Sequence, residues 1–193
     1  MLLNPSDLEF PNGIYEPAED SFLLLDSLQI LPGEKVLDMG TGSGILAIES
    51  ALRGGIVTAV DISEDALLCA ANNAEKQGVT ISTIRSDLFS NIEGLFDVVL
   101  FNPPYLPEEE WSDPGKNDAV WNGGGDGADT IRRFLHDLGK HVRGRCYLLF
   151  SSITGNGEET MVSLLDPNFD FRKINEKRIS FETLFVYEIK RKQ

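Results

Sequence analysis

The sequence predicts an α/β fold: a mostly parallel sheet of seven strands, with helices on both faces and an antiparallel hairpin at the C-terminal end. The first observation is that short apolar runs alternate with amphipathic helical patterns between residues 35 and 165. Strands that alternate with helices are joined by right-handed crossovers, which makes the strands parallel. The second is that two β-rich runs at the end have no helix between them, which indicates a hairpin. With 193 residues, 41% of them hydrophobic, the chain is expected to be one globular domain over 1–193.

The expected elements follow in chain order. Residues 1–13 are polar with two prolines and are predicted to be an extended arm. An apolar stripe over Ser21–Leu31 predicts a helix that begins near Pro17 and ends at Pro32. Residues 1–31 are thus the N-terminal arm and helix, and 33–193 the sheet core. The expected strands are Lys35–Met39, Ile56–Ile62, Val79–Ile84, Phe96–Phe101, Arg145–Ser151, Phe171–Ile179 and Thr183–Lys190. The expected helices are Ile45–Arg53, Ser63–Gln77, Asp129–His141 and Glu158–Leu165.

The charge of the chain restricts its partners. Seventeen Lys and Arg residues stand against 31 Asp and Glu, which gives a net charge of −14. Affinity for nucleic acid comes largely from basic groups that neutralise phosphates, so no stable nucleic-acid binding is expected. No apolar run reaches the length of about 18 residues that a membrane span needs, and the N-terminus lacks the features of a signal peptide. The chain is therefore predicted to be cytoplasmic, with no membrane partner.

A glycine-rich turn follows the first strand. Asp38 is followed by glycines at 40, 42 and 44, and the chain then enters a helix. Glycine lets the backbone turn tightly and lets a ligand approach closely. Asp61 closes the second strand 19 residues after Gly42, a spacing at which an acidic side chain accepts hydrogen bonds from a ribose. Asp87 follows the third strand, where it can meet an adenine amino group.

The spacing of the glycines favours S-adenosylmethionine over a dinucleotide. The dinucleotide pattern is G-x-G-x-x-G, whereas the third glycine here, Gly44, comes one residue early. Asp38 also suits a ligand that carries an amino group, because a carboxylate repels a diphosphate. An ordinary strand-to-helix turn with capping acids is the alternative.

The fourth strand runs into Asn102-Pro103-Pro104-Tyr105. Two prolines stiffen this corner and leave its carbonyls free to accept hydrogen bonds. A planar amide or aromatic amine can donate to the Asn102 oxygen and to a proline carbonyl while it lies against the Tyr105 ring. This arrangement holds the nitrogen in place and localises its lone pair, so all four residues are predicted to be catalytic. Asn102, Pro104 and Tyr105 are predicted to contact the substrate. A plain turn is the alternative.

Together, the glycine turn and the corner resemble the class I S-adenosylmethionine-dependent methyltransferases that modify planar nitrogen, which have a Rossmann-like fold. The segment Tyr15–Asp26 (YEPAEDSFLLLD) is similar to the opening signature of the HemK family. The similarity is greatest to its archaeal and eukaryotic branch, the glutamine N5-methyltransferases of class 1 translation release factors. Trp121–Gly127 (WNGGGDG) and Glu182–Leu184 (ETL) are also similar to that branch.

The resemblance implies an enzyme that methylates the glutamine of the Gly-Gly-Gln motif of a class 1 translation termination factor. It implies that Asp38 and Gly40 hold the methionine part of the cofactor, that Gly42 also binds the cofactor, and that Asp61 binds the ribose hydroxyls. Asp87 and Leu88 would frame the adenine, and Ser21 would reach the cofactor from the N-terminal side. Asn102 would contact both cofactor and substrate.

A small zinc-binding activator protein is the partner that the resemblance implies. Enzymes of this branch pair it with the edge strand of the sheet, which in this chain is predicted at Val79–Ile84. A loop of the same chain covering that edge is the alternative. No metal site is predicted in the chain itself, because His136 and His141 are five residues apart and do not share a helix face.

Three other functions remain open. A nucleic-acid adenine N6- or cytosine N4-methyltransferase could use the same corner on a flipped base, but the charge of −14 argues against it. A protein lysine methyltransferase would suit the acidic run Glu108–Asp113. A non-catalytic binding module is disfavoured by the intact corner at Asn102.

Overall fold

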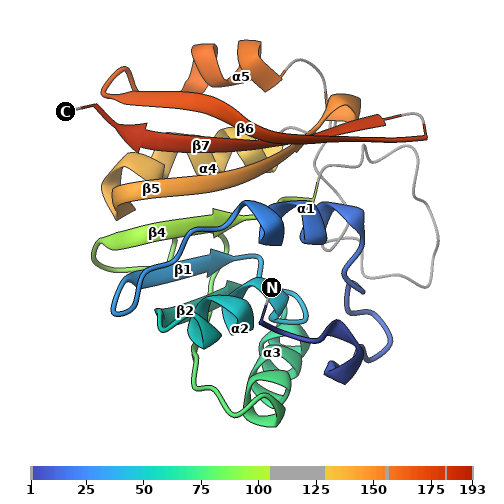
Figure 1. The fold of residues 1–193 in the computed structure, drawn as a ribbon. Coiled ribbons are helices and arrows are strands. Elements are labelled where there is room, and N and C mark those ends of the chain that lie inside the picture. Colours follow the sequence, from blue (N-terminus) through green and yellow to red (C-terminus); the bar gives the residue numbers. More distant parts are fainter. Residues whose placement is uncertain (1, 105–128, 155–156, 181, 193) are drawn as a thin grey trace.

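The computed structural model describes residues 2–104, 129–154, 157–180 and 182–192. Seven strands in these residues form one sheet in the order β3-β2-β1-β4-β5-β7-β6 (Figure 1). The parallel strands are β1 (Lys35–Met39), β2 (Ile56–Asp61), β3 (Ser82–Arg85), β4 (Phe96–Phe101) and β5 (Val142–Ser151). β7 (Glu182–Arg191) lies between β5 and β6 (Phe169–Ile179) and is antiparallel to both. The predicted parallel sheet with a C-terminal antiparallel hairpin is confirmed.

Helices cover both faces of the sheet. One face carries α1 (Glu19–Ser27), α2 (Ile45–Leu52) and α3 (Glu64–Lys76), and the other carries α4 (Asp129–His141) and α5 (Gly157–Leu164) (Figure 1). Short 3₁₀ helices lie at Pro5–Asp7 and Ser152–Thr154. Successive residues of a strand point to opposite faces, so Val36 joins the core under α2 while Leu37 joins the core under α4. The central strands are therefore mostly apolar on both sides, as is typical of parallel strands covered by helices on both faces.

Several helix boundaries follow directly from local sequence. α3 begins after Ser63, whose hydroxyl oxygen accepts a hydrogen bond from the backbone N–H of Ala66 at 3.3 Å. This is the N-cap that the sequence predicts. α4, β1 and β4 have the predicted bounds. The other helices and strands, apart from α1 and β3, differ from the predicted ones by one to three residues at an end.

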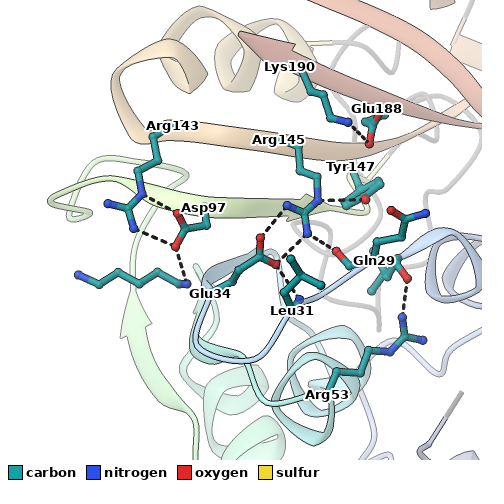
Figure 2. A network of polar contacts seen from close by, with 12 residues as sticks. Gln29, Leu31, Glu34, Arg53, Asp97, Arg143, Arg145, Tyr147, Glu188 and Lys190 are labelled. Carbon is teal, nitrogen blue, oxygen red and sulfur yellow. Dashed lines mark hydrogen bonds and ion pairs between the residues drawn. The ribbon is translucent and has the colours of Figure 1, made fainter.

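The predicted end of the first helix is wrong. α1 ends at Ser27, and Leu28 already has extended backbone, although the apolar stripe continues to Leu31. Pro32 has no N–H to donate to the carbonyl of Leu28, so a helix that continued to Leu31 would leave this carbonyl without a backbone partner. Two arginines from other elements supply hydrogen bonds here instead. Arg53 donates to the carbonyl of Leu28, and Arg145 donates to the carbonyl of Gln29 (Figure 2).

The predicted strand at Val79–Ile84 is misplaced. The strand observed there, β3, covers Ser82–Arg85. The backbone N–H of Val79 instead donates to the carbonyl of Ala74 at the end of α3, and the side chains of Val79 and Ile81 pack against the core of the chain. β3 is nevertheless the edge of the sheet, as expected.

The N-terminal arm is more ordered than an extended segment. Leu3 and Leu8 are buried in the core under α2. The buried Glu49 carboxylate of α2 accepts hydrogen bonds from the backbone N–H groups of Leu2 and Leu3 at 2.8–2.9 Å. Among the described helices, none is long and apolar enough to cross a bilayer.

A polar network ties β5 to the loop before β1 at the amino-terminal end of the parallel strands (Figure 2). The Arg145 guanidinium donates to both carboxylate oxygens of Glu34 at 2.8 Å and to the hydroxyl of Tyr147 at 3.1 Å. The Glu34 and Arg145 side chains are only 17% and 15% exposed. The hydrogen bonds from Arg145 lower the pKa of Glu34 from its usual 4.5.

Replacing Arg145 with methionine is expected to lower the free energy of unfolding by about 1.5–3 kcal/mol at neutral pH, since Glu34 loses charge-assisted hydrogen bonds. A carboxylate whose pKa is lowered by folding stabilises the protein above its unfolded pKa and stops doing so as the pH falls through the folded value. The difference between wild type and variant should therefore shrink below pH 4.5. Urea unfolding at several pH values measures it. Arg143→Met is the control, because the Arg143–Asp97 pair is more exposed and should contribute much less. Equal losses in the two variants would contradict the expectation.

Candidate functional site

A cavity of about 500 Å³ opens beyond the carboxyl ends of β1, β2 and β4. β1 has β2 on one side and β4 on the other, so the order of the strands reverses here, at the point where α/β sheets bind ligands. Most of the predicted site residues meet at this cavity. Those that line it are Ser21, Gly40, Gly42, Asp61, Asp87, Leu88, Asn102, Pro103 and Pro104.

Asp38 lies beneath the glycine turn instead of on the cavity wall. Its side chain is fully buried. One carboxylate oxygen, Oδ2, accepts hydrogen bonds from the hydroxyl of Thr41 at 2.7 Å and the backbone N–H of Ala47 at 3.1 Å. The other, Oδ1, has no partner among the described residues. Burial raises the pKa of Asp38 to about 7. Asp38 thus ties the turn to the start of α2. It is not among the residues that line the cavity, and its predicted contact with the cofactor stays a prediction.

Glycine is needed at positions 42 and 44 of the turn for different structural reasons. Gly42 has a φ of +54°, and a Cβ there would meet no atom within 4 Å, so the turn is open beside it. Gly44 has a φ of +85°, and a Cβ there would lie 2.8 Å from the Cβ of Ala70. Gly44 therefore allows α2 to begin in close contact with α3, while Gly42 belongs to the cavity wall.

Asp61 connects the end of β2 to the glycine turn. Its Oδ2 accepts a hydrogen bond from the backbone N–H of Gly42 at 3.0 Å, and its Oδ1 accepts one from Ser63 at 2.9 Å. Burial raises its pKa from the usual 3.8. The Asp61 carboxylate borders the cavity. Asp61 and Gly42, which are 19 residues apart in the sequence, are thus in direct contact.

Asp87 has a partner that the sequence did not reveal. Arg133 of α4 donates to its Oδ2 at 2.6 Å, and both residues line the cavity. Leu88 has a φ of +48°, and its carbonyl accepts a hydrogen bond from the hydroxyl of Ser86 at 2.7 Å. Arg133 is 46 residues from Asp87, so only the packing of α4 on the sheet could show this pair.

Asn102 directly follows β4, and only one of the two polar groups of its side-chain amide has hydrogen-bond partners among the described residues. The Nδ2 group donates to the Oδ2 of Asp20 at 3.2 Å and to the hydroxyl of Ser21 at 3.3 Å. Its Oδ1 is buried and has no hydrogen-bond partner in the described part of the chain. An acceptor that lacks a partner in a cavity wall is suited to an N–H donor from a bound molecule.

The N-terminal segment Tyr15–Asp26 contributes an acidic residue, Asp20, to the cavity wall beside Asn102. Asp20 is 4% exposed, lines the cavity and lies next to the predicted Ser21. The sequence prediction missed it, although a carboxylate beside Ser21 in the same motif was a signal for it. Tyr105, the acidic run at 108–113 and the segment at 121–127 lie outside the described residues.

The chain is similar to known methyltransferases. The family model described as the methyltransferase small domain matches residues 16–114. A putative protein N5-glutamine methyltransferase from Methanocaldococcus jannaschii is 40% identical over 178 residues, which cover 90% of this chain and 89% of that protein. The release factor glutamine methyltransferase of Gloeobacter violaceus is 35% identical over 73% of this chain, which spans only 53% of that enzyme.

A solved structure shares the fold over most of its length. It is the E. cuniculi Mtq2–Trm112 complex, described as responsible for methylation of the eRF1 translation termination factor. The matched chain has a TM-score of 0.74 and 28% identity, with 93% of this chain and 99% of that one covered.

Proposed function

Because the chain belongs to the methyltransferase small domain family, we propose that it methylates the side-chain amide nitrogen of a glutamine, with S-adenosylmethionine as the methyl donor. The glutamine is that of the Gly-Gly-Gln motif of a class 1 translation release factor. The observation that carries this proposal is the Oδ1 of Asn102, an acceptor without a partner among the described residues, at the cavity of a chain 40% identical to a putative N5-glutamine methyltransferase.

The cavity suits the proposed cofactor. Its volume of about 500 Å³ and its position at the switch point of the sheet are typical of a nucleoside-containing ligand. When bound, S-adenosylmethionine supplies an electrophilic methyl group on a sulfonium sulfur. Gly40 and Gly42 would hold the methionine part, with Asp38 supporting the turn from below. Asp61 would accept hydrogen bonds from the ribose hydroxyls.

The other end of the cofactor would lie between the third and fourth strands. Asp87 and Leu88 would border the adenine, and the ion pair with Arg133 holds the Asp87 carboxylate at the cavity. Ser21 would approach from α1 on the N-terminal side.

At the corner, Asn102 would orient the side-chain amide of the target glutamine. Its Oδ1 would accept one N–H of the glutamine amide, and a proline carbonyl of Pro103 or Pro104 would accept the other. These two hydrogen bonds leave both protons on the nitrogen, favour the localised form of the lone pair that amide resonance otherwise delocalises, and hold the nitrogen in place for attack. Tyr105 is proposed to lie flat against the amide.

A methyl-transfer assay with labelled S-adenosylmethionine tests the proposed function. The acceptors are the release factor, the same factor with Gln→Ala in its Gly-Gly-Gln motif, and a nucleic-acid duplex. Label on the wild-type factor alone is the expected result. Label that persists on the Gln→Ala factor would redirect the proposal to another side chain, such as lysine, and label on the duplex would replace it with a base methyltransferase.

We also propose that a small zinc-binding activator protein pairs with β3. The support is that β3 is the sheet edge and that Ser82, Thr83 and Arg85 are exposed on it. The related Mtq2 chain was solved in complex with Trm112. Running the same assay with and without the candidate partner, alongside co-elution in gel filtration, tests this. A chain that is fully active alone and does not co-elute with the partner would contradict it.

Replacing Asp61 with alanine is expected to weaken the binding of S-adenosylhomocysteine about 10–100-fold. The reason is that hydrogen bonds to a charged group contribute about 1.5–3 kcal/mol. Isothermal titration calorimetry measures the affinity. Asp65→Ala is the matched control, because Asp65 is exposed on α3 and does not line the cavity. Similar affinities for the two variants would show that Asp61 does not hold the cofactor.

A further inference from the structure

We propose that Asp20 is a positioning residue, which sets the orientation of the Asn102 side-chain amide so that Oδ1, and not Nδ2, faces the methyl acceptor. The inference rests on the proposed function, in which that oxygen accepts an N–H of the target amide.

An asparagine side chain presents a donor group on one side and an acceptor on the other, so its orientation decides which of them a substrate meets. Here Nδ2 donates to the Oδ2 of Asp20 at 3.2 Å and to Ser21 Oγ at 3.3 Å, and Oδ1 has no partner among the described residues. In the flipped orientation, the Asn102 oxygen would lie against the Asp20 carboxylate oxygen, and the two acceptors would repel each other. The flipped amide would also offer N–H groups to a substrate that itself donates N–H.

Asp20 is held so that only one oxygen is available to Asn102. It is 4% exposed, and its Oδ1 accepts hydrogen bonds from the hydroxyl of Tyr15 at 2.6 Å and the backbone N–H of Ser21 at 2.5 Å. The opening segment therefore occupies Oδ1 and leaves Oδ2 for the amide 82 residues away. A hydrogen bond to a buried carboxylate also polarises the amide and increases the electron density on its oxygen. The free oxygen thus becomes a stronger acceptor.

The substitution Asp20→Asn tests this inference with almost no change in size. The oxygen of the new amide would keep the Tyr15 and Ser21 hydrogen bonds, and its NH₂ group would replace Oδ2. Two NH₂ groups would then face each other, and the Asn102 amide would rotate to accept from its new neighbour. We expect kcat for methyl transfer to fall about 10²-fold or more, the size typical of a lost transition-state hydrogen bond. The affinity for S-adenosylhomocysteine should change much less.

A second substitution should restore the acceptor. In Asp20→Asn combined with Asn102→Asp, a carboxylate at 102 accepts from the amide at 20 and still presents an oxygen to the cavity. The double variant should therefore recover at least about 10-fold in kcat over either single variant, whereas independent losses would add. Asn102→Asp alone places two carboxylates side by side and should be poorly active. Asp26→Asn, an exposed acid on the same helix, is the matched control and should behave as wild type.

Three results would overturn the inference. They are wild-type kcat in Asp20→Asn, additive losses in the double variant, and unchanged Asn102 side-chain NH₂ resonances in Asp20→Asn. The NMR measurement, with contacts from the Asn102 NH₂ to Ser21 expected only in the wild-type chain, does not depend on the methyl acceptor. If the wild-type chain fails to label the release factor, the proposed function fails, and the resonances still decide the role of Asp20. Thermal unfolding of each variant separates misfolding from misorientation.

Discussion

Replacing Asn102 with alanine is expected to lower kcat for methyl transfer about 10²–10³-fold. The substitution removes the oxygen that accepts the target N–H, and single hydrogen-bonding groups that stabilise a transition state contribute effects of this size. Affinity for S-adenosylhomocysteine should fall only several-fold, because most of the cavity wall remains. Steady-state kinetics with the release factor, together with calorimetry for the cofactor product, separates the two quantities.

The control for this variant is Asn168→Ala. Asn168 precedes β6, is exposed and does not line the cavity. The kcat of the Asn168→Ala variant should therefore match that of the wild-type chain. If Asn102→Ala kept more than about a tenth of the wild-type kcat, the corner would not be the catalytic element. If instead only the affinity for S-adenosylhomocysteine collapsed, Asn102 would be a cofactor ligand alone.

Replacing Phe134 with alanine is expected to lower the free energy of unfolding by about 3–5 kcal/mol, the usual cost of removing a buried ring. Phe134 of α4 is fully buried, and its ring centroid lies 4.4 Å from that of Phe101 and 5.2 Å from that of Phe89. The loss leaves a cavity between α4 and the sheet. Because Phe101 directly precedes Asn102, the corner should also lose support, and kcat should fall even at temperatures where the variant is folded.

Urea unfolding followed by circular dichroism measures the change in stability. Val162→Ala on α5 is the control, since Val162 is 74% exposed and its truncation should cost less than about 0.5 kcal/mol. A loss below about 1.5 kcal/mol in Phe134→Ala would indicate that the aromatic cluster rearranges to fill the space.

The parts of the fold that were predicted correctly are those whose signals are local. α3 has its capping serine and first-turn acids in consecutive positions, and α4 has a stripe of apolar residues at helical spacing. β1 and β4 are short, mostly apolar runs that end in a turn. The incorrect predictions occur where an apolar pattern extends beyond the element, after the end of α1 and before the start of β3. Such a pattern indicates that side chains are buried. It does not show where a helix or strand ends, because a segment without regular secondary structure can also bury its side chains.

The features of the site are also of two kinds, those that the sequence predicts and those that only the structure shows. By itself the sequence determined the fold class and brought the glycine turn, Asp61 and Asn102 to one edge of the sheet, because residues that follow parallel strands must lie at their carboxyl ends. Only the tertiary structure decided that Asp38 lies beneath the turn, that Arg133 pairs with Asp87, and that Asp20 holds the amide of Asn102. These contacts join residues that are distant in the chain or depend on how deeply a side chain is buried. Both are consequences of helices packing on the sheet, which no local pattern of residues specifies.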